Sequence, residues 1–75
     1  MISEEHLYEA YNNSFRVLIL GYDVDEMLID NVMFAHNPMK RYPTYREVKK
    51  ILNYFKQQGE IKKCIAIKTY LETHQ

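Results

Sequence analysis

Apolar residues in the second half of the chain recur at the spacing of an amphipathic helix. Four of them fit the i, i+3, i+4, i+7 positions of one helix face: Val48, Ile51, Leu52 and Phe55. Thr44 and Glu47 form a capping box at the start of this run, and Gly59 suits the left-handed residue that follows a helix end. The pattern therefore predicts a helix over residues 45–58.

A second apolar stripe begins directly after Gly59. Ile67 and Tyr70 widen this stripe, and its principal members repeat the helical spacing: Ile61, Cys64, Ile65 and Leu71. The stripe predicts a helix over residues 60–73. Because the connection is so short, the two helices are expected to lie antiparallel, with the apolar face of the first packed against the principal members of the second stripe.

The first half of the chain carries two more helix signals. Ser3 is a suitable N-cap, and apolar residues at three- and four-residue spacing predict a helix over residues 4–20 that ends before Gly21. Residues 15–20 also fit a strand, because Phe, Val and Ile favour strands and the preceding Asn pair favours a turn. A single strand needs a partner, and the sequence offers none that is convincing except around residues 65–67, so the helix is preferred.

The third helix signal starts at Asp23. With Glu26 it resembles a capping box, and the apolar residues that follow predict a helix over residues 24–35. Apolar side chains surround more than half of this helix, which indicates that it lies between other helices or against a partner. Residues 36–43 contain both prolines and show no periodicity, so we expect an extended connector there.

Length and composition agree with a small helical protein. The 75 residues are about half of an average domain, and two Gly and two Pro provide few turns for a sheet of many short strands. We therefore predict an all-α fold, a single helical domain over residues 1–75. The predicted architecture is a small bundle of three to four helices that ends in an antiparallel helical hairpin.

The location of the protein is predicted from its cysteine and its apolar runs. Cys64 is the single cysteine and cannot form an intramolecular disulfide, which favours a reducing cytoplasm. The first residues lack the basic character of a secretory signal, and the longest apolar run, residues 17–20, is too short for a membrane span. We expect a cytoplasmic protein that does not associate with membranes.

Residue types that carry catalysis are few and scattered. His6, His36 and His74 lie on three separate segments, and the acidic residues near Asp23 lack the glycine and the distant glutamate of a calcium loop. Cys64 lies on an apolar stripe, where a free cysteine is usually a packed hydrophobic residue. The sequence therefore predicts a protein that is not an enzyme, with no catalytic residue, no cofactor and no metal.

Binding to another protein is the function that the sequence favours. A core this small supplies only about 3–5 kcal/mol, so self-association or a partner that completes the core is expected. The predicted helix over residues 24–35 has more apolar side chains than one small fold can bury, and aromatic and Arg anchors lie just beyond it. The predicted protein-binding residues are Met27, Ile29, Met33, Phe34, Arg41, Tyr42 and Tyr45. The partner is a protein, and a second copy that forms a homodimer is one candidate.

Charge distribution supports a second hypothesis, nucleic-acid binding. The net charge is zero, yet residues 1–39 hold seven acidic side chains and one arginine, whereas residues 40–75 hold three acidic and nine basic ones. Aromatic residues interleaved with cations can stack on bases and neutralise phosphates. The predicted nucleic-acid-binding residues are Lys40, Arg41, Arg46, Lys49 and Lys50. Nucleic-acid binders usually carry a basic excess, so this hypothesis ranks second.

Residues 61–69 resemble the UVR motif, a helical hairpin of bacterial nucleotide-excision repair proteins and some stress-response adaptors. Ile61, Cys64, Ile67 and Lys68 match the motif, whereas Lys62 and Thr69 stand where the family prefers acidic residues and Ile65 is larger than its usual alanine. The resemblance covers residues 43–72. It implies a hairpin that binds proteins, pairs with a like hairpin and has no catalysis. The whole chain also looks like short uncharacterised proteins of tailed bacteriophages, which implies a regulator of a host protein.

Overall fold

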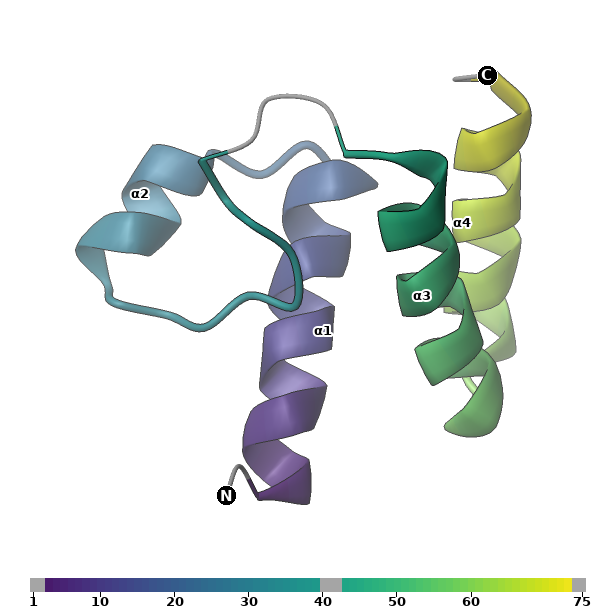
Figure 1. Ribbon diagram of the computed structural model, residues 1–75, viewed down its shortest axis with the longest axis horizontal. Coiled ribbons are helices and arrows are strands. Elements are labelled where there is room, and N and C mark those ends of the chain that lie inside the picture. The colour runs from purple at the N-terminus through teal and green to yellow at the C-terminus, as the bar shows by residue number, and fades with distance from the viewer. Residues whose placement is uncertain (1–2, 40–42, 74–75) are drawn as a thin grey trace. The chain divides into compact units, whose positions relative to one another are not determined.

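The computed structural model describes residues 3–39 and 43–73 and contains four helices in that part of the chain (Figure 1). These are α1 (Glu4–Leu18), α2 (Val24–Ile29), α3 (Tyr45–Gln57) and α4 (Ile61–Thr73). No strand occurs among the described residues. The predicted all-α fold class is therefore confirmed.

The chain divides into two compact units. Unit 1, residues 1–41, contains α1 and α2, and unit 2, residues 42–75, contains α3 and α4. That residues 1–75 form a single domain stays a prediction.

Helix α1 begins at the predicted cap and extends through the Asn pair. The hydroxyl oxygen of Ser3 accepts a hydrogen bond from the His6 N–H at 3.2 Å, which satisfies one of the free donors of the first turn. Residues 15–18 continue the helix, so the helical alternative is confirmed for them and the strand is wrong. The helix ends two residues before the predicted boundary, and Gly21 adopts a left-handed φ of 76° just beyond it.

Helix α2 is shorter than predicted, ending at Ile29 instead of residue 35. Asn31 adopts a left-handed φ of 55°, a conformation that Asn tolerates better than most residues and that stops helix propagation. Its N–H donates a hydrogen bond to the Leu28 carbonyl at 3.0 Å, closing a tight turn in place of another helical turn. The prediction of a helix over 30–35 was therefore wrong.

Helix α1 supplies the hydrogen bonds that hold the residues after this turn. The Asn13 side-chain NH₂ donates to the Met33 carbonyl at 3.0 Å. The Ala35 N–H donates to the Ser14 hydroxyl oxygen at 2.8 Å and also lies 3.2 Å from the Ala10 carbonyl oxygen. These backbone groups are thus satisfied by α1 and need no helix of their own.

Two polar residues are part of the buried face of α1. Ser14 is fully buried and Asn13 is nearly so. The other buried residues of α1 are apolar: Ala10, Tyr11 and Phe15. The His36 ring nitrogen Nδ1 lies 2.7 Å from the Ser14 hydroxyl, and the Phe34 ring meets the His36 ring edge to face at 5.6 Å. Buried polar groups are costly unless they are paired, and here they fix the segment over residues 33–36 to α1.

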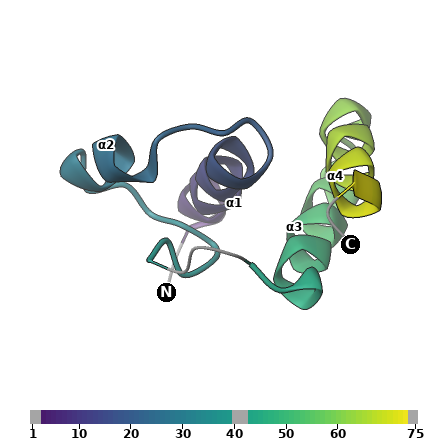
Figure 2. The same ribbon diagram turned by 90° about the horizontal axis from the view of Figure 1, so that it is seen from above.

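Unit 2 is the predicted antiparallel hairpin, in which α3 and α4 lie side by side in both views (Figures 1 and 2). The Thr44 hydroxyl oxygen accepts from the Glu47 N–H at 3.2 Å, as its capping position predicts. Gly59 follows α3 with a left-handed φ of 74°. The predicted face of α3 is confirmed, because its four members are buried: Val48, Ile51, Leu52 and Phe55.

The face that α4 turns inward differs from the predicted one. Ile67 is fully buried, whereas Ile61 and Ile65 are 72% and 58% exposed. The Nζ of Lys63 lies 4.8 Å from the centre of the Phe55 ring, and the same Nζ pairs with a Glu60 carboxylate oxygen at 3.3 Å.

A lysine thus occupies the position next to α3 that the apolar pattern assigned to isoleucine. The long stem of Lys63 can cover an aromatic ring while its ammonium group stays near water. Counting four residues on from Lys63 gives Ile67, so the inward row of α4 passes through these two residues. The expected packing of Ile61 and Ile65 against α3 was therefore wrong.

Candidate binding surfaces

Helix α2 has no buried residue, although four of its six residues are apolar. Ile29 is the most exposed of them, at 83%. The Asp23 carboxylate accepts from the Asp25 N–H at 2.9 Å and so serves as the helix cap. Leu28 is 37% exposed, and four further exposed residues form what we call the α2 surface: Asp25, Glu26, Ile29 and Asp30.

The other predicted protein-binding residues lie in different environments. Met27 and Phe34 are half-buried in unit 1, and Met33 is 42% exposed. Tyr45 is exposed but belongs to unit 2, at the start of α3. Arg41 and Tyr42 lie outside the described residues. Among the described members of the predicted set, Ile29 and Met33 are the exposed ones within unit 1.

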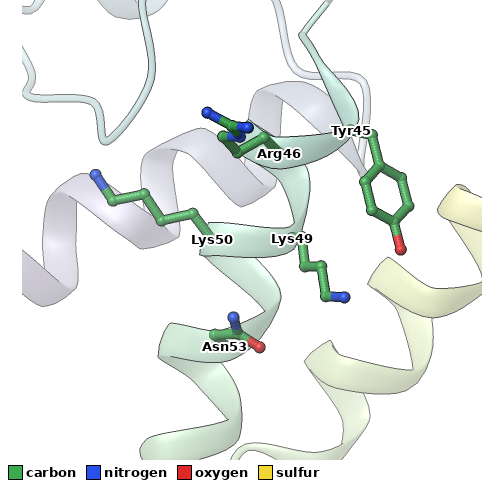
Figure 3. Close-up of a pocket in the computed structure, with 5 residues that line it drawn as sticks. All are labelled: Tyr45, Arg46, Lys49, Lys50 and Asn53. Atoms are coloured by element: carbon green, nitrogen blue, oxygen red, sulfur yellow. The ribbon is translucent and has the colours of Figure 1, made fainter.

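The cations of the nucleic-acid hypothesis lie on α3. Five residues of this helix line a shallow pocket: Tyr45, Arg46, Lys49, Lys50 and Asn53 (Figure 3). The Lys49 Nζ lies 5.6 Å from the centre of the Tyr45 ring, a cation–π contact. In the close-up, Arg46 and Lys50 extend to one side of the helix, and Tyr45 and Lys49 to the other. Lys40 and Arg41 lie outside the described residues.

A groove in unit 2 was not predicted. It has a volume of about 200 Å³ and lies between α3, the Gly59 turn and α4. We call it the hairpin groove, and its lining residues are Leu52, Lys56, Gly59, Ile61, Cys64, Ile65 and Lys68. Apart from Leu52, the apolar lining comes from the stripe of α4 that the sequence analysis had placed in the core. The stripe itself was recognisable in the sequence, but the side of α4 that faces α3 was not.

Two absences concern the described ranges, 3–39 and 43–73. No three His, Cys, Asp or Glu side chains within them are placed to hold one metal ion together. None of the helices there combines the length and the apolar character that crossing a membrane requires.

Comparisons with protein-family models, with curated proteins and with solved structures yield no match to this chain. The similarity of residues 43–72 to the UVR motif and the likeness to phage proteins therefore stay predictions.

Proposed function

We propose that the protein is a non-enzymatic binding domain that recognises another protein through the α2 surface. The observation that carries the proposal is the exposure of Ile29, which is 83% accessible on a helix without a buried residue. Hydrophobic residues exposed singly are common, but Leu28, the preceding residue, and Met33, four residues further along the chain, are also more than a third exposed. A partner protein that packs on these side chains would remove their apolar surface from water, which favours binding.

The length of α2 supports the same proposal. A six-residue helix is too short to be stable by itself in water, because nucleation costs more than so few hydrogen bonds return. Most helices gain their stability from a packed apolar face, and no residue of α2 is buried. A partner that packs on Ile29 would supply that face.

The acidic residues of the α2 surface indicate the character of the partner. Glu26 and Asp30 are exposed and lie four residues apart, on either side of Ile29 along the chain. A partner that buries Ile29 has to satisfy these carboxylates with cationic or hydrogen-bonding groups. The expected partner surface is therefore an apolar site with a basic rim.

The test of this proposal compares Ile29→Asp with Met39→Asp. Met39 is 77% exposed and lies outside the helices, so its substitution adds the same charge at a similarly accessible position. Each variant is immobilised and used to capture binding proteins from lysate. The molar mass of each variant in solution is measured by light scattering. We expect Ile29→Asp alone to lose a captured protein or to lower the mass. Equal capture and equal mass for wild type and both variants would refute the proposal.

A second candidate function, nucleic-acid binding, is supported by the exposed cations of α3. Arg46, Lys49 and Lys50 lie within two turns of the helix, next to the exposed ring of Tyr45. Phosphate contacts of this kind weaken steeply with added salt. Retention on single-stranded DNA or RNA at low salt that disappears with Lys49→Glu and Lys50→Glu would support it. No retention at low salt would remove it.

A further inference from the structure

The hairpin groove combines an apolar floor with two cations. Ile61 and Ile65 lie one helical turn apart on α4 and are both more than half exposed. Lys56 from α3 and Lys68 from α4 line the same groove. Both lysines are exposed, so their ammonium groups are available to an incoming charge.

We propose that the hairpin groove binds the α2 surface of a second copy of this chain. The inference rests on the proposed function and names the partner of that surface. The α2 surface carries one large exposed apolar side chain, Ile29, together with acidic residues. The groove offers the complementary combination of exposed isoleucines and lysines.

Charge decides between the two ways in which copies could meet. Two hairpin grooves facing each other would bring Lys56 and Lys68 of one copy against those of the other, which is repulsive. An α2 surface in the groove instead pairs Glu26 and Asp30 with these lysines while Ile29 enters between Ile61 and Ile65. The opposite charges of residues 1–39 and 40–75 favour the same orientation at longer range.

The size of the contact sets its strength. Six helical residues extend only about 9 Å, so one such contact buries less than the roughly 800 Å² per partner of a standard interface. A pair of copies that exchange α2 surfaces makes two identical contacts around a twofold axis. We expect a dissociation constant between about 10 µM and 1 mM. Added salt should weaken the association, because it screens the exposed charges.

The experiment uses charge reversal on each side of the contact. One full-length chain carries Lys56→Glu and Lys68→Glu in the groove, and the other carries Glu26→Lys and Asp30→Lys on the α2 surface. Each variant alone places like charges together and should stay at the 9.1 kDa of a single chain. In a mixed pair one contact keeps the wild-type charges and the other has both charges reversed. Both contacts are then attractive, so the mass should approach twice that value. Circular dichroism verifies that each variant is helical.

Lys62→Glu is the matched control, because Lys62 is exposed on α4 and does not line the groove. It should associate as the wild type does. A mixture that stays at the single-chain mass would overturn the inference, as would a wild-type chain that remains single at 1 mM. So would a groove variant that associates like the wild type.

These results also separate the inference from the proposed function. If Ile29→Asp loses a captured foreign protein while the groove variants change nothing, the α2 surface binds another protein and the inference is wrong. If Ile29→Asp changes neither capture nor mass, the proposed function itself fails.

Discussion

Ile67 and Ile65 provide a direct test of which side of α4 packs on α3. Replacing Ile67 by Ala removes three carbon atoms from a fully buried side chain. At about 0.8 kcal/mol for each buried methylene-sized group the loss is about 2.4 kcal/mol, and the cavity left behind brings the range to about 2–5 kcal/mol. The same replacement at Ile65, which is 58% exposed, should cost about 1 kcal/mol at most.

These costs are large against the stability of so short a chain. At about 0.05–0.15 kcal/mol per residue, 75 residues give about 4–11 kcal/mol of unfolding free energy. With a melting shift of about 4–8 °C for each kcal/mol, Ile67→Ala should lower the melting temperature by about 10 °C or more. Ile65→Ala should lower it by less than about 8 °C.

The measurement is far-UV circular dichroism of both variants during heating and in urea, at equal protein concentration. Equal protein concentration matters because self-association stabilises the folded state by mass action. A loss of unfolding free energy at Ile65 equal to that at Ile67 would refute the assignment of the inward face of α4.

Three further predictions concern hydrogen bonds and backbone conformation, each measured as a change in unfolding free energy. Ser14→Ala removes two hydrogen bonds of the hydroxyl, one from the Ala35 N–H and one with the His36 ring, and should cost about 1–3 kcal/mol even though the Ala35 N–H keeps the Ala10 carbonyl; an unchanged free energy would show that these contacts are not stabilising. Thr44→Ala removes the cap of α3 and should cost about 1 kcal/mol, whereas Thr44→Ser should restore most of it. Gly59→Ala places a side chain in open space but at a φ of 74°, so strain alone should cost about 1–2 kcal/mol, and a stabilised variant would contradict the turn geometry.

The sequence allowed prediction of those parts of the fold that local signals determine. The start of α3 is fixed by the capping pair Thr44 and Glu47, and its end lies just before Gly59. All three residues interact with the backbone only a few positions away, so the bounds of α3 could be predicted from the sequence. Ser3 located the start of α1 in the same way. Such caps and turns depend on neighbours in sequence and hardly on the rest of the fold.

Parts that depend on distant contacts were not predictable in this way. The segment after Asn31 carries apolar residues at helical spacing, yet its backbone bonds to Asn13 and Ser14, about 20 residues away. On α4, a charged residue, Lys63, lies over Phe55, whereas Ile61 and Ile65 of the apolar stripe are exposed. A periodic pattern identifies a helix but not which of two wide apolar faces meets a neighbour.

Of the two candidate surfaces, one could be predicted from the sequence and the other could not. An excess of apolar side chains after Asp23 was apparent from the sequence, and Ile29 is exposed accordingly. The hairpin groove depends on the rotation of α4 about its own axis, which pattern analysis had assigned the other way.

The hydrogen bonds from Ala35 to α1 have a consequence for the dynamics of unit 1. The Ala35 amide lies outside every helix, but its acceptors on Ser14 and Ala10 keep their positions only while α1 is wound. Its proton should therefore exchange with solvent as slowly as the amides of α1. The chain between Ser14 and Ala35 is then a closed loop with both ends anchored, and α2 lies within it. A partner that packs on α2 would bind a helix held in a loop whose ends are already fixed, so little chain entropy would be lost on binding.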